Sequence, residues 1–287
     1  MNIKQYSNAK EFLSHAGKNL ARDEARYGLV LGLAKVVEHN PHRYGKEAPW
    51  FCSVENGGDI NAVAMRTPPH MVLLAYFSGD LRMIAETLIR AVSGKSKVIP
   101  GVVGDKELAD IFARLWCEKY DVKIVDTMAQ RIFRLDKVND ISLSSGKFRV
   151  ATMADKELVK KWGHAFHVDI GGVERNMPQS DITPVLERGW VFLWEDGKPV
   201  SMALKTRPTE KGMTVGGVYT PPELRRRGYA TSCVAELSRN ILQTDKKFCM
   251  LYTDLANPTS NSIYKKIGYK EVCDSVQYTF QMPSIKT

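Results

Sequence analysis

The sequence lacks any long apolar run. No segment approaches the ~20 consecutive apolar residues that cross a bilayer as a helix. The first residues, Met1–Tyr6, also lack the apolar core of a secretory signal peptide. These absences predict a cytoplasmic protein that has no membrane partner.

Cysteine is scarce and shows no metal-ligand spacing. The five cysteines fall mostly within apolar patterns: Cys52, Cys117, Cys233, Cys249 and Cys273. We therefore expect reduced thiols and no metal site, because structural zinc sites need closely spaced ligands.

Charge and composition limit the kinds of ligand that the chain is expected to bind. The chain has 287 residues, 44% of them hydrophobic, which suits one large or two ordinary globular domains. Its formal net charge of +9 suits an anionic ligand. Acidic residues lie between the basic ones, so the sequence does not favour nucleic acid as a partner, and it does not define an oligomeric state.

Two common phosphate-binding patterns are also absent: the Gly-Lys-Ser/Thr ending of a nucleoside triphosphate loop and the Gly-x-Gly-x-x-Gly of a dinucleotide fold. A basic loop, Arg225–Gly228, instead joins two regular segments. The apolar, β-branched residues of Met213–Tyr219 predict a strand before it. After it, apolar residues at three- and four-residue spacing predict an amphipathic helix; they are Ala230, Cys233, Val234, Leu237 and Ile241.

The start of that helix suits a phosphate group. The first amides of a helix have no intrahelical partner, and the positive end of its dipole lies behind them. Gly228 and the small Ala230 would let phosphate oxygens approach the backbone closely. The pattern predicts an anion cradle, while a solvated basic turn or a non-specific polyanion patch stays open as a plainer interpretation.

A second motif follows about thirty residues later. Phe248–Thr253 is typical of a strand, and Asn257-Pro258 of a turn. We expect Ser260 or Thr259 to cap a short helix that Gly268 ends.

Together the two motifs resemble the GNAT superfamily of N-acetyltransferases. Arg225, Gly228 and Ala230 fit its pyrophosphate loop, Arg/Gln-x-x-Gly-x-Gly/Ala, and Asn257 and Tyr264 fit its Asn…Tyr-x-x-x-Gly-Phe/Tyr element. The resemblance covers roughly Lys147 to Phe280 and implies acetyl-coenzyme A as co-substrate. It places these residues at the coenzyme: Val218, Tyr219, Thr220, Arg225, Arg226, Arg227, Gly228, Tyr229, Ala230, Thr231, Asn257, Ser260, Ser262 and Tyr264.

The resemblance also implies roles in acyl transfer. Main-chain amides near Val218 and Thr220 would polarise the thioester carbonyl, and Tyr264 would protonate the leaving thiolate as general acid. Tyr264 could instead be a helix-face aromatic. Asp254 is the candidate general base, with a turn or cap role as the alternative, and a water chain could replace it.

The resemblance implies an α/β (α+β) fold with two GNAT-like domains, each a mostly antiparallel mixed sheet with helices on both faces. Residues 146–287 show the order β-α-α-β-β-β-α-β-α-β of a GNAT domain. Residues 1–140 repeat part of that order, with strands near Trp50–Val54, Ile60–Arg66 and Met71–Phe77, and another over Ser96–Pro100. Helices are expected over Leu81–Val92 and Lys106–Tyr120, followed by short strands near Val122–Val125 and Arg131–Arg134.

The first domain is predicted to be catalytically silent. Its loop Ser78–Ile84 lacks the arginine and glycine pattern, and Asp80 would repel a phosphate. No Asn…Tyr-x-x-x-Gly element follows it.

In the second domain, His164 and His167 share a helix face beside the expected acceptor site. They are read as a surface pair or as a lining of that site. The segment Val168–Gln179 is expected to be a loop that determines acceptor specificity.

The predicted function is transfer of an acetyl group from acetyl-coenzyme A to a primary amine by direct attack. One rival is a non-catalytic acyl-coenzyme A sensor, and another is a nucleic-acid-associated protein. The sequence does not identify the amine.

Overall fold

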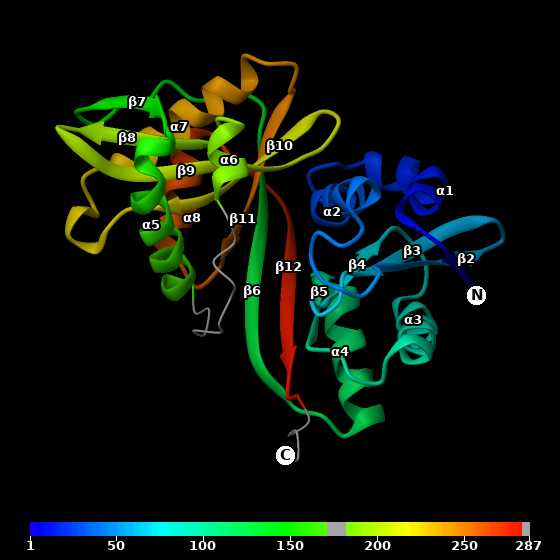
Figure 1. Ribbon diagram of the computed structural model, residues 1–287. Helices are drawn as coiled ribbons and strands as arrows, with labels where there is room; N and C mark the ends of the chain where they lie inside the picture. The colour runs from blue at the N-terminus through cyan, green and yellow to red at the C-terminus, as the bar shows by residue number, and fades with distance from the viewer. Residues whose placement is uncertain (171–181, 283–287) are drawn as a thin grey trace. The chain divides into compact units, whose positions relative to one another are not determined.

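The computed structural model describes residues 1–170 and 182–282 of the chain (Figure 1). The first half contains β1 (Asn2–Tyr6), α1 (Ala9–Ala21), α2 (Gly28–His39), β2 (Trp50–Asn56), β3 (Asp59–Arg66), β4 (Val72–Tyr76), α3 (Leu81–Lys95), β5 (Gly101–Asp105), α4 (Lys106–Tyr120) and β6 (Ile124–Leu135). The second half contains β7 (Lys147–Val150), η1 (Met153–Asp155), α5 (Lys156–Asp169), α6 (Thr183–Glu187), β8 (Val191–Asp196), β9 (Lys198–Pro208), β10 (Gly212–Tyr219), η2 (Pro222–Leu224), α7 (Tyr229–Leu242), β11 (Phe248–Asp254), α8 (Pro258–Ile267) and β12 (Lys270–Phe280).

The same element order occurs twice. Apart from the 3₁₀ turns η1 and η2, each half reads β-α-α-β-β-β-α-β-α-β over the described residues. The order predicted for the second half is confirmed, and the first half repeats all of it rather than a part.

The chain forms two compact units that interleave in sequence. The first unit comprises Met1–Ile132, Thr253–Ala256 and Val272–Thr287, and the second comprises Phe133–Tyr252 and Asn257–Glu271. The last strand returns to the first unit, because β12 pairs antiparallel with β5. The predicted domain ranges, 1–140 and 146–287, stay a prediction.

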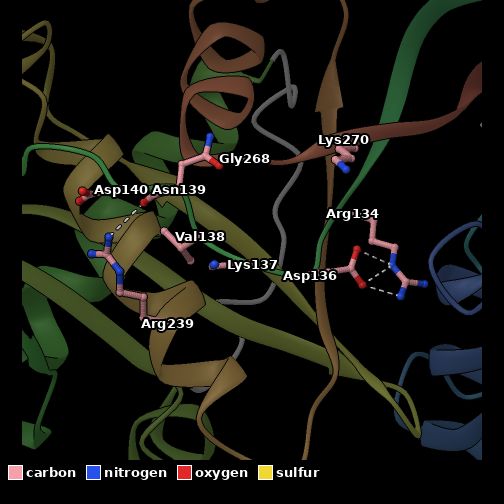
Figure 2. A pocket seen from close by; sticks show the side chains of 9 residues that line it. All are labelled: Arg134, Asp136, Lys137, Val138, Asn139, Asp140, Arg239, Gly268 and Lys270. Atoms are coloured by element: carbon pink, nitrogen blue, oxygen red, sulfur yellow. Dashed lines mark hydrogen bonds and ion pairs between the residues drawn. The ribbon is translucent and has the colours of Figure 1, made fainter.

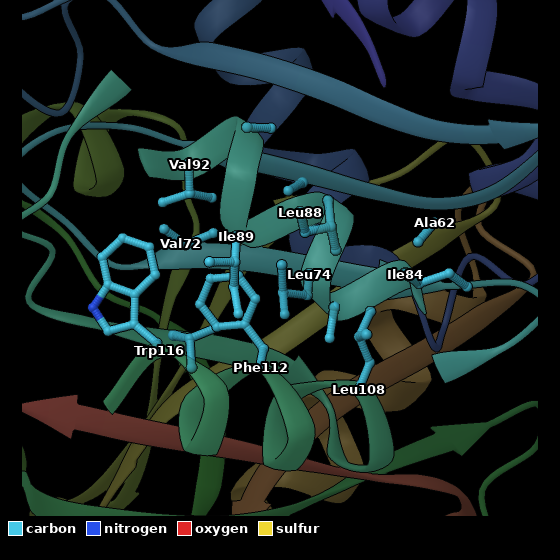
Figure 3. Close-up of a cluster of buried hydrophobic side chains, with 14 of the residues drawn as sticks. Ala62, Val72, Leu74, Ile84, Leu88, Ile89, Val92, Leu108, Phe112 and Trp116 are labelled. Atoms are coloured by element: carbon cyan, nitrogen blue, oxygen red, sulfur yellow. The ribbon is translucent and has the colours of Figure 1, made fainter. Parts of the chain in front are cut away.

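The first unit buries both faces of its sheet. Strands β1 to β4 pair antiparallel in chain order, and β4 pairs parallel with β5. Side chains alternate along β4 because successive residues of a strand point to opposite faces. Val72 and Leu74 pack with α3 and α4 (Figure 3), whereas Leu73 and Ala75 pack with α1 and α2.

The second unit is built in the same way. Strands β7 to β10 pair antiparallel in chain order, and β10 pairs parallel with β11. Helices α7 and α8 pack on one face with Phe192 and Val215. Helices α5 and α6 cover the other face with Leu193 and Met202. The predicted mixed sheet with helices on both faces is therefore confirmed.

Two local predictions differ from the structure, and two helices were not predicted. The strand expected over Ser96–Pro100 is wrong, since the strand is β5, Gly101–Asp105. The two short strands read near Val122 and Arg131 are one strand, β6. The sequence analysis did not assign α1 and α2, which cover one face of the first sheet.

An ion-pair network holds the start of α5 in the second unit. The two Nη groups of Arg149 donate to the Asp155 carboxylate at 2.8 Å each, and Nε donates to Glu195 at 2.5 Å. Asp155 also accepts the Thr152 backbone N–H at 2.8 Å. Asp155 occupies the N-cap position of α5 but makes no side-chain cap bond there; its carboxylate instead completes a capping box with Thr152 at the start of η1, directly before α5.

The network predicts an acid-sensitive contribution to stability. Hydrogen bonds from Arg149 lower the pKa of Asp155 from 3.8 to about 2. Because the folded-state pKa is depressed, the carboxylate stabilises the fold above about pH 4, and this stabilisation is lost as the pH falls towards 2. Asp155→Asn should lower the free energy of unfolding at pH 7 by about 2 kcal/mol and flatten its loss in acid.

Urea unfolding at pH 7, 4 and 3 measures both effects. Asp136→Asn is the matched control, because that carboxylate pairs with Arg134 at a side chain that is 57% exposed. An equal loss in both variants would contradict the assignment.

Candidate coenzyme and acyl-transfer site

The predicted site begins where two parallel strands of the second unit part. Strand β10 pairs with β11 from Gly212↔Phe248 to Thr214↔Met250. Beyond Thr214, β10 shifts register on β9, and Gly217 takes a left-handed φ of +56°. A bulge of this kind bends a strand and ends its pairing. Val218 and Tyr219 therefore lie past the last registered pair with β11.

Side chains hold the end of β10 in place. The buried Ser201 hydroxyl donates to the Tyr219 carbonyl at 3.1 Å and accepts from the Thr220 hydroxyl at 2.9 Å. The Tyr219 ring packs 6.0 Å from the Trp162 ring of α5. Sequence reasoning did not find Ser201, although a serine between apolar residues of a strand is a signal that a buried hydroxyl has a partner.

The loop after β10 turns sharply into α7. Arg226 has a φ of +62° and Gly228 a φ of +81°, so two backbone units in three residues are left-handed. Gly228 is the N-cap of α7 and makes no side-chain cap bond. Because the N-cap residue has no side chain, it does not cap the first amides of α7. An anion cradle needs such uncapped amides.

The three arginines of the loop do different things. Arg225 donates from Nε to the Thr220 carbonyl at 3.0 Å and forms an ion pair with Asp169 at the end of α5. It therefore ties the loop to β10 and α5. Arg226 and Arg227 are exposed and have no ion pair among the described residues, so their charges are available beside the start of α7.

Tyr229 contributes its backbone, not its ring, to the start of α7. Its hydroxyl donates to Asp196 at 2.7 Å, and its side chain is 8% exposed. Ser232, one turn of helix further on, accepts the Ser144 backbone N–H at 2.8 Å. Both contacts anchor α7, while Ala230 and Thr231 stay half-buried at its first turn.

The second motif forms the start of α8. Asn257 caps the helix by accepting the Ser260 backbone N–H at 3.0 Å, so the expectation that Ser260 or Thr259 caps it is wrong. Asn257 can cap the helix because its side-chain carbonyl reaches the backbone N–H three residues ahead. Gly268 ends the helix at a φ of +113°, as predicted.

Tyr264 lies deep in the core of the second unit. It is 8% exposed, with its ring 6.3 Å from Phe133 and 5.8 Å from Tyr269. Burial raises its pKa to about 12. The phenol is therefore protonated at neutral pH, which is the form a general acid requires. Its role in catalysis stays a proposal.

The Asp254 carboxylate, the candidate general base, already makes a structural hydrogen bond. It accepts the Ala256 backbone N–H at 2.8 Å, which is the geometry of an Asx-turn. The turn role weighed from the sequence is thus present, and the role as general base stays a proposal.

His164 and His167 are exposed on α5. No group of three or more metal-ligating side chains occurs within residues 1–170 and 182–282. The predicted loop Val168–Gln179 lies largely outside the described residues. None of the helices in the described part has the length and hydropathy of a membrane span.

Sequence reasoning missed a hollow of about 570 Å³ in the second unit (Figure 2). Its lining contains none of the predicted coenzyme residues; it consists of Arg134, Asp136, Lys137, Val138, Asn139, Asp140, Arg239, Gly268 and Lys270. Arg134 binds Asp136, and Arg239 donates to the Asn139 carbonyl at 3.3 Å. The hollow lies at the last turn of α7, whereas the predicted cradle is at its first.

Comparisons with known proteins bear on the fold. The FR47-like protein family model matches residues 197–278, a range that includes β10, the loop and α8. A GCN5-related N-acetyltransferase from Sphaerobacter thermophilus is 13% identical, with a TM-score of 0.63, and the match covers 99% of this chain and 98% of that one. The chain has the tandem GNAT fold.

Two further structures cover the whole tandem arrangement. A GNAT-family acetyltransferase from Colwellia psychrerythraea is 12% identical, with a TM-score of 0.57, over 98% of this chain and 100% of that one. A tandem GNAT protein from the clavulanic acid biosynthesis pathway is 11% identical, with a TM-score of 0.52, over 99% and 100%. No curated protein matches the sequence. At these identities the structures show the shared fold.

The cradle predicts the effect of a side chain at Gly228. If the first amides of α7 bind acetyl-coenzyme A, the coenzyme should raise the melting temperature by mass action, and the added methyl groups of Gly228→Val should block those amides and abolish the rise. The left-handed φ of +81° should also cost the free protein about 1–2 kcal/mol.

Gly189→Val separates the two effects. Gly189 has a φ of +62°, and an added Cβ would meet its nearest neighbour at 3.7 Å, the same distance as at Gly228. The control should lose similar stability and keep the ligand shift. A full ligand shift in Gly228→Val would place the cradle elsewhere.

Proposed function

We propose that the chain transfers an acetyl group from acetyl-coenzyme A, bound by its second unit, to a primary amine. The observation that carries the proposal is the pairing of an uncapped, left-handed helix start at Gly228 with a strand, β10, that leaves its parallel neighbour just before it. A phosphate group fits the first feature, and an extended ligand that needs backbone amides fits the second.

Each part of the site has a role in this proposal. The amides at the start of α7, with Arg226 and Arg227 beside them, bind the pyrophosphate of the coenzyme. The backbone at Val218 and Thr220 orients the pantetheine and the thioester carbonyl. Residues at the start of α8, namely Asn257, Ser260 and Ser262, bind further along the pantetheine arm.

The proposed reaction is a direct attack. The amine nitrogen bonds to the thioester carbonyl carbon, and the carbon–sulfur bond breaks. The amine loses one proton and the thiolate gains one, so the products are an amide and a free thiol. Tyr264 gives the proton to the thiolate, and Asp254 or a water chain takes the proton of the amine.

An assay of thiol release tests the proposal. The protein is mixed with acetyl-coenzyme A and a panel of amines that includes polyamines, amino acids, peptides and aminoglycosides. At least one amine should release thiol at a rate that depends on both substrates. If acetyl-coenzyme A raises the melting temperature while no amine is acetylated, the protein is an acyl-coenzyme A sensor instead.

Tyr264→Phe tests the general acid. The ring remains in its apolar site and only the proton donor is lost, so kcat should fall while coenzyme affinity changes little. General acid catalysis contributes roughly 10²–10⁴-fold, and we expect the lower end because a thiolate is a stable leaving group. The loss should shrink with a donor whose thiol is more acidic.

The pH profile gives a second readout. Because the folded-state pKa of Tyr264 is about 12, its proton is retained up to that pH, and kcat of the parent should not fall between about pH 8 and 10 through this group. Equal kcat in Tyr264→Phe and the parent, with chemistry rate-limiting, would remove Tyr264 from the mechanism.

A further inference from the structure

The first unit contains a strand junction with the same topology as the β10–β11 junction. Strand β4 pairs parallel with β5 from Val72↔Val102 to Leu74↔Gly104. The two strands lie so close at the last pair that a Cβ on Gly104 would be 2.4 Å from the Leu74 carbonyl oxygen. Asp105 follows Gly104 directly and ends β5.

The Asp105 carboxylate fills the end of this junction. One oxygen accepts the backbone N–H of Tyr76, the last residue of β4, at 2.8 Å. The other accepts Nε–H of Arg26, which precedes α2, at 2.6 Å. The Tyr27 hydroxyl donates to the Tyr76 carbonyl at 2.7 Å. Both backbone groups of Tyr76 are thus bound by side chains of the same unit.

These contacts are partly buried and are not explained by helix capping. The Asp105 side chain is 8% exposed and that of Arg26 is 33% exposed. Asp105 occupies the N-cap position of α4 yet makes no side-chain cap bond, since its carboxylate turns towards Tyr76. Burial raises the pKa of Asp105, against the lowering effect of the Tyr76 and Arg26 bonds. The carboxylate is therefore kept at a cost of desolvation.

The neighbouring helix start is closed as well. Asp80 is the N-cap of α3 and accepts the Met83 backbone N–H at 2.7 Å. A carboxylate thus stands at the place in the first unit that Gly228 leaves open in the second. The backbone N–H groups at the end of β4 and at the start of α3 thus both bind aspartates of the same unit.

We infer that Asp105 is an internal ligand of the β4–β5 junction, and that removal of its carboxylate creates a binding site for a small carboxylate. The native carboxylate supplies the acceptor that Tyr76 N–H and Arg26 need, so a free carboxylate of the same size can supply it in its place. The junction of the first unit is therefore closed to outside ligands in the native chain. This inference stands whether or not the second unit is an acetyltransferase.

Chemical rescue tests the inference. Asp105→Ala leaves Arg26 and the Tyr76 N–H without their acceptor and should lower the melting temperature by roughly 5–20 °C. Sodium formate should recover a large part of this loss with a saturating concentration dependence. Sodium chloride at equal ionic strength should not, and the parent should not respond to formate beyond its response to chloride.

Asp80→Ala is the matched control in the same unit. It removes an exposed capping carboxylate and leaves no unpaired arginine, so formate should give no specific recovery. Formate no better than chloride on Asp105→Ala, or equal rescue of both variants, would overturn the inference.

A double-mutant cycle covers the case in which Asp105→Ala does not fold. Asp105→Asn keeps the size of the side chain, and Arg26→Gln removes the cation. Arg26→Gln should lower the melting temperature less in the Asp105→Asn background than in the parent, because the partner is already lost. Equal decreases in both backgrounds would contradict the pairing on which the inference depends.

Discussion

The second unit depends on the point at which β10 stops pairing with β11. Parallel strands hold each other through slanted backbone bonds, and a bulge against the opposite neighbour bends a strand away from the line that keeps those bonds. The shift at Gly216 to Tyr219, with Gly217 left-handed, bends β10 after Thr214. Both proposed ligand-binding elements follow from this bend, because the loop to α7 leaves from one strand and α8 from the other.

The two halves of the chain use one topology in opposite ways. In each half a parallel pair of strands follows an antiparallel meander, and a helix begins just after the first strand of that pair. In the second unit the helix start has a glycine N-cap and exposed arginines. In the first unit, the Asp80 carboxylate accepts a backbone N–H at the corresponding helix start, and the Asp105 carboxylate accepts one at the end of the corresponding strand. We propose that a site open to anions and one closed to them arise in this way from a few side chains on a shared fold.

Patterns of local origin could be predicted from the sequence. The helices over Lys106–Tyr120 and Thr183–Glu187 and the strand before Thr220 follow from periodicity and turn residues. Helix α1 carried a signal that was not used, an asparagine followed three residues later by a glutamate: Asn8 accepts the Glu11 N–H, and the Glu11 carboxylate accepts the N–H of Ser7, the residue before the cap.

What could not be predicted depends on contacts that are distant in sequence. Strand β5 contains two glycines and looks like a turn, but Gly104 is there because β5 passes so close to Leu74. The same holds for Asp105 and Arg26, which lie 79 residues apart, and for the Ser201 hydroxyl that holds Tyr219. Asp105 stands at the N-cap position of α4, but tertiary packing directs its carboxylate to the Tyr76 N–H instead of to the helix.

We propose that the second unit alone binds the coenzyme, at the start of α7. Calorimetric titration of the full chain with acetyl-coenzyme A tests it most directly through the stoichiometry. We predict one site per chain, because only one of the two helix starts is free of a carboxylate. Two equivalent sites, or no binding, would contradict the account.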